Sequence, residues 1–323
     1  MTGFFFHRWI STLLAGKLLL LSLSGGLLLL PLTAAAEKSS VLIIKSSDNS
    51  YFNSSVEQLI QHSPQADFKI TTLDALQQEN STLPASDYIV TLGLDAANFT
   101  YHLNPQIPVI HSYLTEFQLQ QHAGSMRHYV ILLDQPLPRY LSFIKLLLGT
   151  DRIGLIKNRA SAIDPVQIQN LNASLGIELD QRLFSSGDNP VNMVRDLLQK
   201  NDVLLSLPEP EVYNRHTLKG ILLTAYRQNK PLISYSPSQV SSGALAAIYS
   251  SPQNIGRQIA ALLNRMLQDK FYKPESVYFA SEFDIKFNLN VARSLALELP
   301  DKDELLRKLK QGQPQWDCLN TTP

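Results

Sequence analysis

The chain has 323 residues, of which 44% are hydrophobic and 17% charged, as is typical of a globular protein long enough for two domains. Its 28 basic and 28 acidic residues balance, which argues against the basic surface of a nucleic-acid-binding protein. The single cysteine, Cys318, excludes a disulfide within the chain. We interpret it as a free thiol, and a disulfide between two chains is the alternative.

The N-terminus has the features of a secretory signal peptide. Arg8 and Lys17 precede an apolar run over residues 18–30, and a small-residue Ala-x-Ala site ends at Ala36. We therefore predict a signal peptide over residues 1–36, cleavage after Ala36 and a mature protein in the periplasm. An uncleaved membrane anchor is the alternative, because residues 4–10 could extend the apolar run.

Strands and helices alternate along the first half of the mature chain. Several runs are continuously apolar, which is typical of parallel strands that are buried on both faces. The predicted strands cover residues 41–44, 68–71, 88–92, 108–111 and 129–133. Five strands with intervening helices predict one doubly wound α/β lobe.

The same alternation then occurs a second time. The predicted elements are a helix over 136–148, a strand over 152–156, a helix over 165–175, a strand over 177–184, a helix over 190–200, a strand over 202–207, a helix over 213–228 and a strand over 231–235. The fold class that we predict is α/β, with two doubly wound, Rossmann-like lobes. A final helix over 302–310 is expected to be a solvated surface helix.

The connections between the lobes define the predicted domains. We expect the chain to cross between the lobes near 134–136, 236–242 and 280–287, and several crossings favour hinge closure over free tethering. On this basis lobe 1 comprises residues 37–134 and part of 250–323. Lobe 2 comprises residues 135–249 and part of 270–290.

Two segments of the C-terminal third resemble a known family. Residues 231–267 run from a strand through a small-residue segment into a helix that begins Ser-Pro-x-x-Ile-Gly-Arg-Gln-x-Ala, with Ser251 as the predicted N-cap. Residues 283–300 carry an Asn-Leu-x-x-Ala core that ends in Leu-x-Leu-Pro. This order resembles the substrate-binding proteins of ABC transporters, over roughly residues 41–300. The resemblance implies the type I periplasmic binding protein fold, a small-molecule solute and a membrane permease as partner.

Candidate ligand residues follow from the predicted strand ends. Ligands of open α/β sheets bind beyond the carboxyl ends of the strands. In the first lobe the candidates are Ser46, Ser47, Asp48, Tyr51, Gly93, Asp95, Ser112 and Tyr113. In the second lobe they are Asn158, Glu209, Tyr235 and Ser236. Serines on one side, an acid on the other and two tyrosines would suit an amino acid or a small aromatic zwitterion.

Several of these candidates have a structural alternative. The serine-rich turn after the first strand can cap a helix instead of binding an anion. Asp95 can be the N-cap of the helix that follows Gly93, and Tyr113 can pack at the rim of the lobe. Glu209 could bind a ligand ammonium, or it could be a solvated carboxylate in a loop between two prolines.

Signatures of catalysis and metal binding are absent from the sequence. It contains no Gly-x-Ser-x-Gly, no phosphate-binding Gly-rich loop and no His-Glu-x-x-His. His102, His111, His122 and His128 lie close in sequence, but their spacing fixes no ligand geometry. We expect packing or surface histidines, no metal, no cofactor and no enzymatic activity.

Two functions from different classes fit these features. The first is a periplasmic solute-binding component of an ABC importer, which closes on a small solute in the cleft between the lobes and docks on a membrane permease. It would act as a monomer, without nucleic acid. The second is a periplasmic sensory or scaffolding protein of the same fold that signals to a membrane receptor or kinase.

Overall fold

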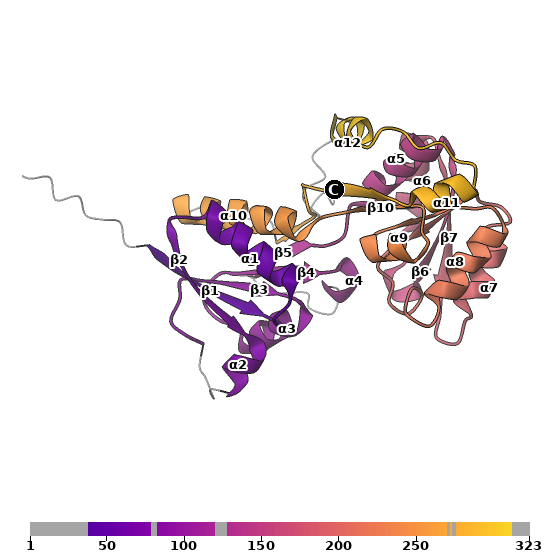
Figure 1. The fold of residues 1–323 in the computed structure, drawn as a ribbon. Helices are drawn as coiled ribbons and strands as arrows, with labels where there is room; N and C mark the ends of the chain where they lie inside the picture. The colour runs from indigo at the N-terminus through magenta and orange to yellow at the C-terminus, as the bar shows by residue number, and fades with distance from the viewer. Residues whose placement is uncertain (1–37, 79–82, 120–127, 270–271, 273–275, 312–323) are drawn as a thin grey trace, which may run out of the picture. The chain divides into compact units, whose positions relative to one another are not determined.

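The chain forms two six-stranded sheets, each flanked by helices (Figure 1). The computed structural model describes residues 38–311 except for 79–82, 120–127, 270–271 and 273–275. The predicted signal peptide and Cys318 lie outside the described residues. We call the part built on the first sheet lobe 1 and the part built on the second sheet lobe 2. Two doubly wound α/β lobes confirm the predicted fold class.

Lobe 1 is built on a sheet in which all neighbouring strands are parallel, in the order β11-β5-β4-β3-β1-β2. Its strands are β1 (Ser39–Lys45), β2 (Ala66–Thr72), β3 (Tyr88–Leu92), β4 (Val109–Leu114), β5 (His128–Leu132) and β11 (Val277–Tyr278). Its helices are α1 (Ser50–His62), α2 (Leu73–Gln78), α3 (Leu94–Leu103), α4 (Glu116–Leu119) and α10 (Pro252–Gln268).

The position of β1 inside the sheet, between β3 and β2, explains the continuous apolar run of its sequence. Val41 and Ile43 pack in one core cluster with residues of α1 and α10. Leu42 and Ile44 point to the other face and pack in a second cluster with residues of α2 and α3. Because successive strand residues face opposite sides, a sheet covered on both faces requires an apolar residue at every position.

Helices α1 and α10 lie side by side on one face of this sheet (Figure 1). Ser251 is the N-cap of α10, and its hydroxyl accepts a hydrogen bond from the amide of Asn254 at 3.2 Å, as predicted. Gly256 permits the close approach of the two helices, because a Cβ atom at this position would meet the backbone carbonyl of Ser55. The glycine of the recognised motif therefore has a packing role.

Lobe 2 is built on a sheet in the order β12-β10-β9-β8-β6-β7, in which only the pair β10–β12 is antiparallel. Its strands are β6 (Arg152–Asn158), β7 (Glu178–Phe184), β8 (Val203–Ser206), β9 (Leu232–Ser234), β10 (Ala246–Tyr249) and β12 (Asp284–Phe287). Its helices are α5 (Leu137–Leu148), α6 (Pro165–Leu175), α7 (Pro190–Leu197), α8 (Leu218–Arg227), α9 (Pro237–Ser242), α11 (Leu289–Ser294) and α12 (Lys302–Gln311), with a short 3-10 turn at Arg159–Ser161.

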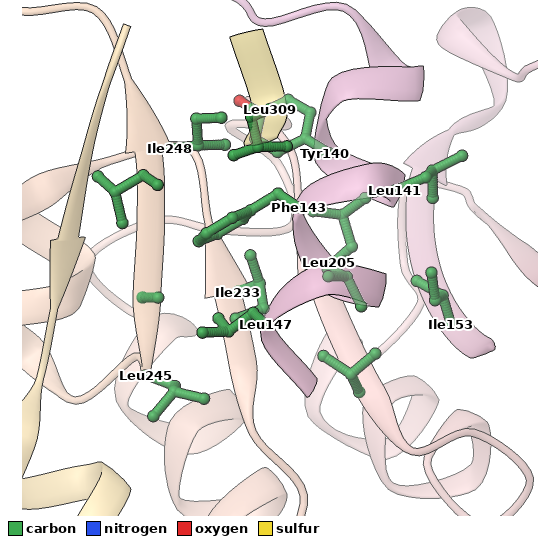
Figure 2. Close-up of a cluster of buried hydrophobic side chains, with 14 of the residues drawn as sticks. Tyr140, Leu141, Phe143, Leu147, Ile153, Leu205, Ile233, Leu245, Ile248 and Leu309 are labelled. Atoms are coloured by element: carbon green, nitrogen blue, oxygen red, sulfur yellow. The ribbon is translucent and has the colours of Figure 1, made fainter. Parts of the chain in front are cut away.

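One core cluster of lobe 2 lies between its sheet and helix α5, and a second one includes residues of α7 and α8. Figure 2 shows Phe143 of α5 among side chains of the neighbouring strands, with Leu309 of α12 close to Tyr140. Leu305 and Leu309 are only 2% and 3% exposed. The expectation that the last helix is merely a solvated surface helix is therefore wrong, because one stripe of α12 completes the core.

The chain passes between the two sheets three times. It leaves β5 for α5 through residues 133–136, leaves β10 for α10 through 250–251, and leaves β11 for β12 through 279–283. The crossing predicted at 236–242 is wrong, because this segment forms α9 and joins β9 to β10 within one sheet. Among the helices of the described residues, none combines the length and hydropathy needed to cross a bilayer.

Candidate functional site

One residue of the turn after β1 caps the helix that follows β3. Ser46 Oγ accepts a hydrogen bond from the amide of Ala96 at 3.0 Å, in the first turn of α3. Gly93 is the N-cap residue of α3 and has φ +98°, and a Cβ atom there would lie 2.5 Å from Ser46 Oγ. Asp95 is exposed in the first turn and is not the N-cap, so that structural alternative is wrong. Ser46 supplies the cap because Gly93 allows it to approach.

The rest of this turn is open to solvent. Ser47, Asp48 and Tyr51 are exposed, and Tyr51 is 66% exposed. Asp48 lies 2.6 Å from the ammonium of Lys45, which also bonds Asn53 at 2.7 Å, and these contacts lower the pKa of Asp48. The carboxyl end of β1 therefore presents polar groups that a solute could reach.

The two candidates on β4 lie inside the strand rather than after it. Ser112 is fully buried, and its hydroxyl donates to the carbonyl of Ile131 at 3.0 Å. Tyr113 has φ +63° at an irregularity of the β4–β5 pairing, and its hydroxyl lies 2.7 Å from Ser55 Oγ. Its ring meets Phe52 edge-on at 4.9 Å, and burial raises its pKa to about 12. In this conformation the polar atoms of both side chains are used within lobe 1.

The environment of Glu209 contradicts one of the two interpretations made from the sequence. Glu209 is 1% exposed, so it is not a solvated loop carboxylate. Its oxygens lie 2.7 Å from Lys157 Nζ and 2.8 Å from Ser161 Oγ, and the amide of Asn158 donates to it at 3.0 Å. This carboxylate neutralises a buried lysine and joins the end of β6 to the loop after β8. A ligand ammonium would have to compete with Lys157 for it.

Asn158 itself caps the turn after β6. Its side-chain oxygen accepts from the amide of Ala160 at 2.9 Å, and its amide nitrogen donates to Glu211 at 2.7 Å. The side chain remains partly exposed at the carboxyl end of β6. A solute could therefore still contact it, in competition with Glu211.

The end of β9 combines a buried polar cluster with a partly exposed tyrosine. The hydroxyls of Ser206 and Ser234 lie 3.0 Å and 2.8 Å from Oε1 of the buried Gln239. Ser236 caps α9 by accepting from the amide of Ser238 at 3.3 Å. Tyr235 lies between these groups, and burial raises its pKa. It is partly exposed just after β9, and its role as a ligand residue stays a prediction.

Hydrogen bonds join the three crossings to one another, a feature that sequence reasoning missed. Gln135 in the first crossing donates to Ser250 Oγ of the second at 2.9 Å, and Ser250 donates to the carbonyl of Glu282 in the third at 2.5 Å. Buried Arg139 donates to Gln135 Oε1 at 2.6 Å and to the carbonyl of Ala280 at 2.7 Å. We call these five residues the hinge network. A polar residue next to a predicted crossing was the only signal for it.

Two histidines of lobe 1, His111 and His128, form a packed pair. His111 Nδ1 lies 2.6 Å from Thr91 Oγ1, and His111 Nε2 lies 2.6 Å from His128 Nδ1. Tyr101 stacks on both rings at 4.5 Å. Within the described ranges no group of three or more His, Cys, Asp or Glu side chains could hold a metal ion. The absence of a metal stays a prediction, because His122 lies outside the described residues.

Two surface hollows of lobe 2 lie away from these groups. One, of about 580 Å³, is lined mainly by α8 and includes Arg215, Leu222 and Tyr226. The other, of about 340 Å³, is lined by residues around Lys286 and Asn288. No candidate ligand residue lines either hollow.

Comparison with known proteins gives matches of structure and none of sequence. No family model and no curated protein sequence matches the chain. A substrate-binding protein with adhesive properties from Clostridium difficile, CD0873, in its ligand-free, open form matches with a TM-score of 0.63 and 13% identity, over 82% of this chain and 97% of that one.

Two further solved structures match with a TM-score of 0.54. An ABC domain from Streptococcus pneumonia in complex with L-Trp is 14% identical, over 84% of this chain and 98% of that one. A conserved domain protein from Vibrio cholerae is 18% identical over the same shares. The matched structures include periplasmic and ABC substrate-binding proteins, so the chain has the type I periplasmic binding protein fold, as the resemblance implied.

Proposed function

We propose that the protein is a periplasmic solute-binding component of an ABC importer, which binds a small solute between its lobes by hinge closure. The observation that carries this proposal is the hinge network, because three crossings that bond to one another restrict the lobes to a concerted motion. The fold supports it, since the matched structures include a substrate-binding protein and a domain in complex with L-Trp. A membrane permease, a signal peptide cleaved after Ala36 and a monomeric state belong to the same proposal.

An amino acid or small aromatic zwitterion remains the solute that we favour. One similar structure holds L-Trp. At the strand ends of this chain, Ser47 and Asp48 of lobe 1 are exposed, and Asn158 and Tyr235 of lobe 2 are partly exposed. Hydroxyl, amide and carboxylate groups beside an aromatic ring suit a solute with both polar and apolar parts.

A thermal-shift screen of residues 37–323 against amino acids, sugars, nucleosides and carboxylates tests this function. A solute that binds only the folded state should add about 2.7 kcal/mol at a hundredfold excess over its Kd, and so raise Tm by several degrees. Tyr235→Ala should abolish the shift. Tyr226→Ala is the matched control, because Tyr226 is 51% exposed on α8 and is not one of the candidate ligand residues. A folded protein that no class of solute stabilises would favour the sensory or scaffolding alternative.

A further inference from the structure

Asp134 is a buried carboxyl group within the first crossing. It is 8% exposed and lies in the segment that joins β5 to α5. Its neighbour Gln135 holds the hinge network together through Ser250 and Arg139. Any group that binds Asp134 would therefore sit beside the residues about which the lobes must move.

The surroundings of Asp134 come from four elements. The backbone amide of Glu116, in α4, donates to Asp134 Oδ2 at 2.8 Å, and the Glu116 carboxylate adds a like charge. Lys157 at the end of β6 supplies the favourable charge that faces it. The hydroxyls of Tyr140 on α5 and Tyr235 after β9 are also close enough to interact electrostatically with it.

Asp134 forms no ion pair among the described residues, although two buried basic side chains lie in the same region. The Lys157 ammonium is 2.7 Å from Glu209, and this pair is neutral on its own. The Arg139 guanidinium is also buried, and it donates to Gln135 and to a backbone carbonyl. An ionised carboxyl group at Asp134 would have no ion-pair partner, which is costly away from water. Burial accordingly raises the pKa of Asp134 to about 7, so that a proton can supply the missing positive charge near neutral pH.

We propose that Asp134 binds the ammonium group of a cationic or zwitterionic solute, which then supplies this buried carboxylate with an ion-pair partner. This inference rests on the proposed solute-binding function and names the chemical class of its solute. The partly exposed ring of Tyr235, which interacts electrostatically with Asp134, offers an aromatic surface for the rest of the solute. The acid that the sequence assigned to this task, Glu209, is replaced by one at the hinge.

The solute and a proton would compete for the Asp134 carboxylate, so the affinity for the solute should depend on pH. The ammonium can bind only the ionised carboxylate, so binding displaces a proton to solvent below about pH 7. Affinity for an ammonium-bearing solute should therefore tighten about fivefold from pH 6 to pH 7, about tenfold from pH 6 to pH 8, and level off above pH 8. A solute without a cation should not show this dependence.

Isothermal titration calorimetry at pH 6, 7 and 8 tests the inference with L-tryptophan and L-leucine as probes. Their des-amino counterparts, 3-indolepropionate and 4-methylpentanoate, and the neutral sugar D-ribose are the comparison compounds. We expect the amino acids to bind with proton release, and Asp134→Asn to weaken their binding at least tenfold at pH 8 and to remove the pH dependence. Asp67→Asn is the matched control, because the Asp67 side chain is 71% exposed on β2, and its affinities should equal those of the wild type.

The outcomes separate this inference from the proposed function. Binding of D-ribose or of a des-amino acid alone, unchanged in Asp134→Asn, would overturn the inference and leave the solute-binding function standing. A folded protein that none of the screened classes stabilises would overturn both. If Asp134→Asn does not fold, carbon-13 NMR titration of the wild type decides. An Asp134 carboxyl that titrates near neutral pH and responds to the amino acids supports the inference, and one that titrates near pH 4 overturns it.

Discussion

Replacing Glu209 by glutamine should destabilise the protein strongly, because it breaks a buried ion pair and preserves the volume of the side chain. The carboxylate is 1% exposed and accepts hydrogen bonds from Lys157, Ser161 and the amide of Asn158, at 2.7 to 3.0 Å. A glutamine keeps one acceptor oxygen. Its amide group turns two hydrogens toward groups that need an acceptor, and it leaves the Lys157 ammonium without a carboxylate partner.

The expected cost follows from the burial of both partners. Removing one member of a buried ion pair typically costs about 3–5 kcal/mol. Lys157 retains 11% side-chain exposure and also faces Asp134, so some of its charge stays compensated. We therefore expect Glu209→Gln to lower the free energy of unfolding by about 3 kcal/mol, and Tm by on the order of 10 °C.

Urea denaturation of a double-mutant cycle measures this cost. Glu209→Gln and Lys157→Met should each be less stable than the wild type, and the double variant should lose less than the sum of the single losses. Asp196→Asn is the control, because Asp196 pairs with Arg195 at the surface, where the two side chains are 65% and 56% exposed. This variant should change the free energy of unfolding by less than about 0.5 kcal/mol. A Glu209→Gln variant as stable as the wild type that fails to bind solute would refute the structural role and restore Glu209 as a ligand acid.

Three further perturbations test the packing, the histidine pair and the hinge. Gly256→Ala should cost about 1–3 kcal/mol in thermal unfolding, because the added methyl group meets the carbonyl of Ser55. Burial lowers the pKa of His128, so as the pH falls the unfolded chain binds a proton at this residue before the folded chain does. The free energy of unfolding should therefore decrease below about pH 6.5. The urea midpoint of His128→Leu should decrease less over the same pH range. Gln135→Ala should cost about 1–2 kcal/mol and speed hydrogen exchange near Ser250, since it removes two hydrogen bonds of the hinge network.

The elements predicted well are those whose pattern has a single physical cause. The strand at Tyr88–Leu92 was predicted to the residue, because an apolar run that ends at a glycine is typical of a parallel strand. Strand β10 (Ala246–Tyr249) was missed, because its alanines carry little strand preference and only the neighbours on both sides make it a strand. That omission placed a crossing in α9.

The site was harder to predict because strand ends serve structure and ligands alike. Ser112 looked like the residue after a strand, but a bond to the carbonyl of Ile131 lets the polar residue stay inside β4. Glu209 looked exposed because prolines flank it, and its partner Lys157 lies far away in sequence. Contacts between residues that are distant in sequence decide which polar groups are already hydrogen-bonded within the protein. A single sequence contains no direct signal for such contacts.

The burial of these groups also argues for where recognition of a charged solute must occur. At the carboxyl ends of the strands, Ser46 and Glu209 are bonded within their own lobes, and each would have to break good hydrogen bonds to bind a solute. Asp134 differs, because it carries a single hydrogen bond from Glu116 and gains a charge partner when a cation arrives. A cation bound to Asp134 would lie next to Gln135, whose hydrogen bond to Ser250 joins two of the crossings. Recognition of charge and restriction of the hinge would then depend on neighbouring residues of one segment.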